Sequence, residues 1–490
     1  MPAQMFIGID IGTSSVKAVM IDRGQTVLAT ASQVLSVSRP HPGHSEQDPL
    51  AWWEATQQVL ARLAADQPEA MRAVAGIGLS GQQHGAVLLD AEQAVLRPAI
   101  LWNDTRSQVE CGELEAALPE LRQIIGNVLM PGFTAPKLRW VAKHEPRLFA
   151  QVRRVLLPKD YVRLRLTGEA VSDMSDASGT GWLDVARRDW SDAALAATGL
   201  DRSHMPRLVE GIAESGIMHG ELASKFGMHG GVVVAGGAGD NAAAACGIGA
   251  VAPGSAFVSL GTSGVLFATT ERFAPNTGSG VHAFCHAVPA RWHQMGVILS
   301  ATDSLEWLAR LLHSDAASLV AALGETVAAP SPALFAPYLA GERTPHNHGS
   351  LRGGFAGLGH EADSKVLTLA VLEGVAFAFR DCLAALEAAG TRIERVWGVG
   401  GGARSRLWLR IMASVLRLPV DLPARAESGG AFGAARLALC AVSGADPTTI
   451  CTPPAIAETI APVAALADAY DAGYVRYRSF GASLKSLVTA

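Results

Sequence analysis

The sequence predicts an α/β protein made of two similar halves with a cleft between them. Three observations predict this fold. The chain has 490 residues, which is too long for one ordinary hydrophobic core. Short apolar runs close to glycines alternate with longer amphipathic stretches, as buried strands and surface helices do. The segment IDIGTS at 9–14 also returns as VSLGTS at 258–263, about half a chain later.

The expected elements follow from these patterns in chain order. We expect strands at 6–9, 74–79, 232–235, 257–260 and 396–399. We expect helices at 52–64, 364–386 and 405–416. A glycine-rich, charge-free segment at 247–253 predicts a division into domains 1–247 and 248–490. After Pro454 we expect a solvent-facing helix that carries Tyr470, Tyr474 and Tyr477.

The composition favours a small soluble ligand over a polymer or a membrane. The net charge of −5 and the pI near 6.3 provide no basic excess for nucleic acid or an anionic bilayer. The six cysteines include no Cys-x-x-Cys pair, and the first residues read as a strand rather than a signal peptide. We therefore expect a cytoplasmic protein with no nucleic-acid or membrane partner, and a homodimer is left open.

Both copies of the repeat place a Gly-Thr-Ser turn directly after an apolar strand. Glycine lets the backbone bend close to a ligand, and the hydroxyl and amide groups of such a turn can bind an anion. The tripeptide also occurs in ordinary hairpins, but its recurrence at the matching place in each half favours a shared role. Two such turns facing each other could clamp a polyphosphate.

The segment GVGGGA at 398–403 leaves two hypotheses open. It fits the dinucleotide pattern Gly-x-Gly-x-x-Ala and has Asp421 about 20 residues further on, so an NAD oxidoreductase is one of them. Such fingerprints usually lie in a first βαβ unit, whereas this one lies late in the chain. We favour a nucleoside cradle at 400–404. Because the sequence has no Gly-Lys dipeptide, any ATP chemistry must use a scaffold other than a Walker-type loop.

Two aspartates are candidate catalytic residues. Asp240 follows a glycine loop at 236–239 and precedes an alanine run, so we expect it at the start of a helix. There it could accept a proton from a substrate hydroxyl that attacks a phosphoryl group, although a plain helix cap would look the same. Asp10 ends the first strand, where it could hold Mg²⁺ through water.

Two polar segments are candidate sugar-binding sites. The loop at 81–85 has the sequence GQQHG, and Trp102 and Asn103 follow an apolar run. Amides, an imidazole and an aromatic face bind sugar hydroxyls and ring carbons. His84 is as often structural as functional in such a loop.

Taken together, these residues resemble the FGGY family of carbohydrate kinases, whose two halves have actin-like (ribonuclease H-like) ATPase domains. The resemblance runs from about 6 to 439 and is carried by a series of motifs in one order: GIDIGTS at 8–14, SEQDP at 45–49, WND at 102–104, GFTAPKL at 132–138, DMSDA at 173–177, GDN at 239–241, GERTPHN at 341–347 and GGGAR at 400–404. One departure concerns the sugar. Gln83 stands where members that phosphorylate xylulose often have methionine.

The resemblance implies a kinase that transfers a phosphoryl group directly from ATP to a small ketose, with D-xylulose as the expected sugar. Asp240 would be the general base, and Asp10 would assist through Mg²⁺. The phosphates would meet Gly12, Thr13, Ser14, Lys17, Gly261, Thr262 and Ser263, and the nucleoside would meet Gly401, Gly402 and Ala403. The sugar would meet Gln83, His84, Asp240 and Asn241. A kinase of another ketose or polyol in the same family is one alternative, and an ATP-driven binding protein on the same fold is the alternative of another class.

Overall fold

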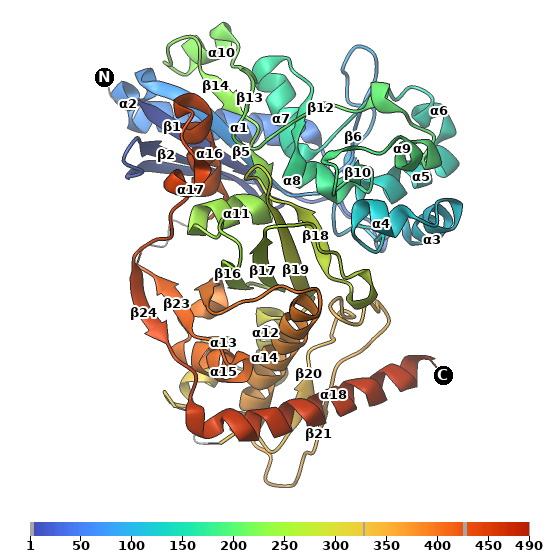
Figure 1. Ribbon diagram of the computed structural model, residues 1–490, viewed down its shortest axis with the longest axis vertical. Helices are drawn as coiled ribbons and strands as arrows, with labels where there is room; N and C mark the ends of the chain where they lie inside the picture. The colour runs from blue at the N-terminus through green and yellow to red at the C-terminus, as the bar shows by residue number, and fades with distance from the viewer. Residues whose placement is uncertain (1–3, 327–328, 425–428, 490) are drawn as a thin grey trace.

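The computed structural model describes residues 4–326, 329–424 and 429–489. Two seven-stranded sheets covered by helices form the two halves of the molecule, one above the other in Figure 1. The predicted α/β class is therefore confirmed. All the expected strands and helices are present, with boundaries shifted by a few residues at most.

The N-terminal sheet begins with a three-stranded antiparallel meander. Its strands are β1 (Met5–Ile11), β2 (Ser15–Asp22), β3 (Val27–Val34), β5 (Val74–Gly81), β13 (Glu214–Ile217), β14 (Val233–Ala235) and β15 (Ala238–Gly239). The order is β13-β14-β5-β1-β2-β3, and β15 pairs with the end of β5. Strand β5 runs parallel to β1, so the carboxyl ends of both strands meet at one edge of the sheet.

The C-terminal sheet repeats this plan. Its strands are β16 (Ala256–Leu260), β17 (Gly264–Thr270), β18 (His282–Cys285), β19 (Trp292–Ile298), β22 (Val396–Val399), β23 (Val420–Pro423) and β24 (Ile456–Ile460). Strand β16 is antiparallel to β17 and parallel to β22, as β1 is to β2 and β5. The sequence repeat therefore corresponds to a repeat of structure, with the Gly-Thr-Ser turn at the same hairpin in each half.

Helices cover both sheets and fill the insert after β5. The main ones are α1 (Pro49–Asp66), α11 (Asp240–Ile248), α12 (Thr302–Leu311), α14 (Ser364–Ala388), α15 (Arg406–Leu416) and α18 (Ala467–Thr489). The insert carries α3 (Gln108–Ala117), α4 (Leu121–Ile125), α5 (Thr134–His144), α7 (Pro158–Thr167) and α8 (Met174–Ala177). Asp48 caps α1 by accepting a hydrogen bond from the Leu50 amide, and Pro49 starts the helix.

Helix α16 (Gly430–Ser443) comes from the last quarter of the chain but packs on the N-terminal sheet (Figure 1, red helix among the blue strands). The contact requires glycine in the strands. A Cβ atom at Gly8 would lie 1.8 Å from the Ala431 carbonyl oxygen, and one at Gly78 would lie 1.8 Å from that of Ala434. The C-terminal segment thus helps to build the N-terminal half, and the expected division at 247/248 stays a prediction.

The last helix, α18, differs from the expectation of a solvent-facing helix. The side chains of Tyr470 and Tyr477 are fully buried, and the Tyr470 hydroxyl donates to Glu373 at 3.1 Å. The Tyr474 hydroxyl donates to Asp381 at 2.5 Å. The Tyr477 hydroxyl accepts from the Tyr338 hydroxyl at 3.0 Å. Spacings of three and four residues place these rings on one helix face, where their apolar area packs against α14.

None of the helices within the described ranges combines the length and the hydropathy needed to cross a membrane.

Candidate active site

Asp10 and Asp240 are neighbours at the edge where β1 and β5 end. Asp10 accepts a hydrogen bond from the Ser80 hydroxyl at 2.8 Å, because Asp10 and Ser80 are register partners on parallel strands. Burial raises the pKa of Asp240 to about 6, and the nearby charge of Asp10 adds to the rise. Burial also raises the pKa of Asp10. The Asp240 carboxyl therefore lies close enough to Asp10 to sense its charge.

Asp240 occupies the first turn of α11, as the glycine loop predicts. Gly237 has φ of 74°, and a Cβ atom there would lie 2.1 Å from the Leu79 carbonyl oxygen, so only glycine fits. Strand β15 then pairs with Ser80 and Gly81, which brings the start of α11 beside Asp10. Asn241 donates two hydrogen bonds to the same oxygen of the Asp240 carboxylate, one from its backbone amide at 2.7 Å and one from its side-chain amide at 2.9 Å. One Asp240 oxygen is thus held, and the other stays available.

The first Gly-Thr-Ser turn joins β1 to β2 on the same edge. The Thr13 hydroxyl donates to Gln82 at 2.7 Å and accepts from the Trp102 indole at 3.0 Å. Ser14 is exposed. Lys17 lies opposite Asp10 in the β1–β2 register, and its charge lowers the pKa of Asp10 against the larger effect of burial. The turn therefore combines exposed donors with a lysine, as an anion site does.

The second turn and the glycine-rich segment meet in the C-terminal sheet. Gly261 and Thr262 accept hydrogen bonds from Thr302 and Ala301 at 2.9 and 2.8 Å, which fixes the turn against α12. Gly400 has φ of 89°, and a Cβ atom there would lie 2.7 Å from the Leu260 carbonyl oxygen. Thr262 and Gly401 face open space, whereas Ser263 is half-buried and Gly402 and Ala403 are buried. Adjacent ends of β16 and β22 thus carry both features.

The loop after β5 holds Gln83 and His84 in fixed positions. The Gln83 side-chain amide donates to the Ser175 carbonyl at 3.1 Å. The His84 Nδ1 atom lies 2.6 Å from the Gly179 carbonyl oxygen, so Nδ1 carries the proton and Nε2 is an acceptor. Burial lowers the pKa of His84 to about 3, and the positive charge of Lys137 adds to the effect. A neutral histidine with a free acceptor suits a sugar hydroxyl.

Trp102 and Asn103 are both exposed, and the Trp102 side chain is 46% accessible. The indole hydrogen bond to Thr13 places Trp102 beside the first turn. That Trp102 and Asn103 contact a sugar stays a prediction.

Sequence patterns missed two buried residues here. Lys137 is fully buried and donates to the His84 and Gly132 carbonyl oxygens at 2.8 and 2.7 Å. Lysine is almost always exposed, so its type gave no signal, although it lies within a recognised motif. Ser80 could have been found, because a polar residue that ends a strand parallel to β1 must lie near Asp10.

The surroundings of Asp421 do not favour dinucleotide binding at the glycine-rich segment 398–403, because in that pattern an acidic residue about 20 positions further on must be open to a ribose. That carboxylate is buried, lies 2.8 Å from the Arg395 guanidinium, and accepts from the Thr459 hydroxyl at 2.6 Å. It is therefore engaged within the sheet instead of being open to a ribose.

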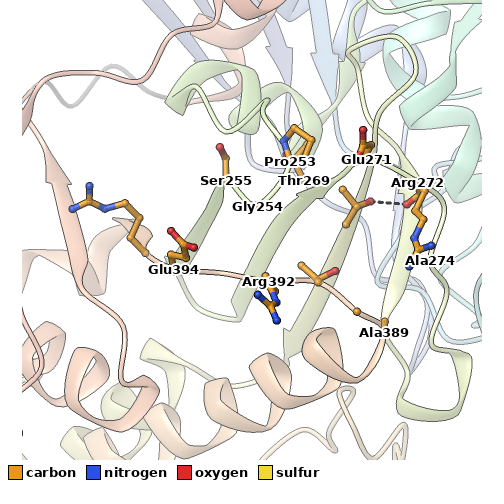
Figure 2. Close-up of a pocket in the computed structure, with 14 residues that line it drawn as sticks. Pro253, Gly254, Ser255, Thr269, Glu271, Arg272, Ala274, Ala389, Arg392 and Glu394 are labelled. Atoms are coloured by element: carbon orange, nitrogen blue, oxygen red, sulfur yellow. Dashed lines mark hydrogen bonds between the residues drawn. The ribbon is translucent and has the colours of Figure 1, made fainter.

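A cavity of about 700 Å³ lies away from these residues (Figure 2). The segments that line it precede β16 and β22 or lie at the end of β17, which is antiparallel to β16. The second turn and the glycine-rich segment instead follow β16 and β22. The cavity therefore lies at the opposite end of the C-terminal sheet. The guanidinium groups of Arg272 and Arg392 lie apart in Figure 2 and do not converge on a common point.

The fold and the paired carboxylates define the class as a two-lobed α/β enzyme with a polar site on the N-terminal lobe. The N-terminal domain model of the FGGY family of carbohydrate kinases matches residues 5–247, and the C-terminal domain model matches residues 256–442. The chain therefore belongs to the FGGY family of carbohydrate kinases, and it is a kinase rather than an oxidoreductase.

Several relatives are similar over most of the chain. The xylulose kinase of Escherichia coli strain K12 is 50% identical over 440 residues, which cover 90% of each protein. The xylulose kinase of Klebsiella pneumoniae is 50% identical over 439 residues, covering 89% of this chain and 90% of the relative. A solved structure described as a xyloylose kinase from Brucella ovis is 56% identical, with a TM-score of 0.97 over 99% of this chain and 100% of that one.

Proposed function

We propose that this protein phosphorylates D-xylulose to D-xylulose 5-phosphate at the expense of ATP. The observation that carries the chemistry is the pair of adjacent carboxylates, Asp10 and Asp240, beside the His84 loop. The choice of sugar is supported by relatives named xylulose kinase at 50% identity over most of the chain. An open-chain ketose with neutral hydroxyls suits a site lined by Gln83 and a neutral His84.

In the proposed mechanism, Asp240 is the general base. In its ionised form it accepts the proton of the terminal sugar hydroxyl as that oxygen bonds to the γ-phosphorus of ATP. The bond between the γ-phosphorus and the bridging oxygen breaks, and ADP leaves with the electron pair. Asn241 holds one oxygen of Asp240, which leaves the second oxygen for the proton. No phosphoenzyme is formed.

The donor set near Asp10 fits Mg²⁺. This metal usually keeps several waters and takes one or two carboxylates together with substrate phosphates. Asp10 offers such a carboxylate, and a cation would relieve the repulsion between it and Asp240. Asp10 would hold Mg²⁺ through water, and the ion would neutralise charge on the phosphates of ATP.

ATP would bind between the two halves. We assign its phosphates to both Gly-Thr-Ser turns and Lys17, and its nucleoside to the glycine-rich segment after β22. The sugar is assigned to the loop after β5, to the start of α11 and to the exposed indole. The residues of these three groups are Gly12, Thr13, Ser14, Lys17, Gly261, Thr262 and Ser263; Gly401, Gly402 and Ala403; and Gln83, His84, Asp240, Asn241, Trp102 and Asn103.

Sugar-dependent release of ADP tests this function. The kinase proposal requires ADP to appear stoichiometrically with a phosphorylated sugar, and only when sugar is present. An ATP-driven binding protein would release ADP and inorganic phosphate without any phosphorylated sugar, and that result would reject the proposal.

The pKa of Asp240 predicts the pH dependence of the reaction. The protonated form cannot accept a proton, so activity is present above about pH 6 and is lost below it. We expect kcat/KM for D-xylulose to fall roughly tenfold per pH unit on the acid side. Initial rates from pH 4.5 to 8 check this, with enzyme returned to pH 7.5 to confirm that the loss is reversible. Constant kcat/KM between pH 5 and 7 would remove Asp240 from the role of base.

A further inference from the structure

The segment that begins α8 contacts two parts of the proposed site at once. Ser175 is fully buried, and its carbonyl oxygen accepts the Gln83 side-chain amide at 3.1 Å. Its hydroxyl accepts the backbone amide of Gly239, the residue before Asp240, at 3.1 Å. A Cβ atom at Gly239 would lie 2.7 Å from the Gln83 side-chain nitrogen, so the three residues pack without spare room.

The Ser175 hydroxyl has one possible orientation. It donates its single proton to the Asp173 carboxylate at 2.5 Å, which leaves its lone pairs for the Gly239 amide. Asp173 also caps α8 by accepting the Ser175 amide at 2.8 Å. The Ser175 hydroxyl that accepts the amide before Asp240 is therefore oriented by the charged Asp173 side chain.

A buried ion cluster holds Asp173 in turn. Lys159 lies 2.9 Å from Asp173, 2.5 Å from Asp160 and 3.0 Å from Asp176, and all four side chains are inaccessible to solvent. Removing one partner from such a cluster leaves an uncompensated buried charge, so its geometry is strongly constrained. Lys159 belongs to α7, and its Cβ atom would lie 3.0 Å from a Cβ atom added at Gly81.

Helix α7 also anchors the start of the glycine loop that precedes Asp240. Arg163, one turn after Lys159, donates to the carbonyl oxygens of Ala235 and Gly236 at 2.5 Å each. The loop at 235–239 is thus held at its start by Arg163 and at its end by Ser175.

We propose that Ser175 is a positioning residue for the phosphoryl transfer, whose hydroxyl fixes the location of Asp240 through the Gly239 amide. The inference rests on the proposed function. The two contacts of Ser175 can be separated by mutation, because a side-chain substitution removes the hydrogen bond to Gly239 but keeps the backbone carbonyl that holds Gln83. The hydroxyl should therefore affect kcat, while sugar affinity is retained.

The variant Ser175→Ala tests this separation. Misplacing a catalytic group by about 1 Å can cost on the order of 100-fold in rate, so we expect kcat to fall roughly 10- to 100-fold. The KM values for D-xylulose and ATP should stay within about twofold of the wild-type values, because the substitution removes no contact that binds either substrate in the ground state.

Ser178→Ala is a matched control on the same segment. Ser178 is also buried; its hydroxyl donates to the Met174 carbonyl at 2.7 Å and accepts the Cys285 amide at 3.0 Å. Ser178→Ala therefore also loses one donated bond and one bond accepted from a backbone amide, although the donated bond goes to a neutral carbonyl and neither bond involves Gly239. Melting temperatures of both variants would report the shared loss of stability. Ser175→Cys, which fills the space but offers only a weak sulfur acceptor, replaces Ser175→Ala if that variant does not fold.

A kcat at least fivefold lower for the Ser175 variant than for Ser178→Ala, with unchanged sugar KM, supports the proposal. A smaller difference, or a raised sugar KM with normal kcat, overturns it. Wild-type enzyme that fails to phosphorylate D-xylulose in the same assay would instead reject the proposed function.

Discussion

Asp240→Asn is expected to lower kcat by about 10²- to 10⁴-fold, the range for loss of a general base. Asparagine has nearly the same shape and can still accept the hydrogen bonds of Asn241, but it cannot take the proton of the sugar hydroxyl. The KM for ATP should change little, because the phosphates are assigned to other residues. Steady-state kinetics with saturating D-xylulose measure this loss, and turnover within tenfold of the wild type would contradict the assignment.

Stability provides the control for this variant. The pKa of Asp240 is raised to about 6 in the folded protein, above the ordinary aspartate value of 3.8. A raised acid pKa means that ionisation opposes folding, a cost that is fully present above about pH 6 and absent below the unfolded value. Asp240→Asn removes this charge, so its melting temperature at pH 7.5 should equal or exceed that of the wild type. If Asp240→Asn melted at a lower temperature than the wild type, its loss of activity would be explained by damage to the structure instead of by loss of the base.

Gly78→Ala is expected to have the largest effect on stability. The new Cβ atom would lie 1.8 Å from the Ala434 carbonyl oxygen, far inside van der Waals contact, and its other nearest neighbours are also backbone atoms of Ala434. Overpacking of this kind costs about 3 kcal/mol or more, because α16 must move away from β1 and β5. The N-terminus of α16 would shift with it, and Gly430 there lies beside Asp10 and Ser80. Activity should therefore fall along with stability.

Gly112→Ala is the matched control for this substitution. Gly112 lies in α3, is exposed, and a Cβ atom there would meet no atom within 4 Å. Alanine is favoured over glycine in a helix by about 1 kcal/mol, so this variant should be as stable as the wild type or slightly more so. Urea denaturation and residual activity compare the two. Equal stability of both variants would mean that α16 does not press on β5 as described.

The sequence predicts much of the fold because local patterns and global structure agree. The repeated Gly-Thr-Ser turn marks the same hairpin in both sheets, and the glycine loop before Asp240 does place that residue at a helix start. The packing of α16 on the other half had no local signal, since an alanine- and glycine-rich helix fits many surfaces. Only the spatial partner explains why Gly8 and Gly78 are glycines.

Candidate site residues were predictable where polar groups follow a strand, and were missed where charge is buried. Asp10, Gln83 and His84 stand at strand ends, so their types and positions indicate a site. Lys137 and Lys159 are fully buried lysines whose partners include the His84 carbonyl oxygen and the Asp173 carboxylate, which lie on other elements. Residue type argues against burial of lysine, and only the assembled structure supplies those partners.

The most direct test of the proposed function is a comparison of kcat/KM for D-xylulose, D-ribulose, glycerol and D-gluconate with the same enzyme. We expect D-xylulose to give the highest value and gluconate the lowest, since Gln83 and neutral His84 offer no charge to pair with a carboxylate. A missing or inverted hydroxyl leaves buried groups unpaired, at about 1–3 kcal/mol each. His84→Ala should reduce the preference for D-xylulose. A higher kcat/KM for D-ribulose or D-gluconate would contradict the assigned sugar and leave only the kinase activity standing.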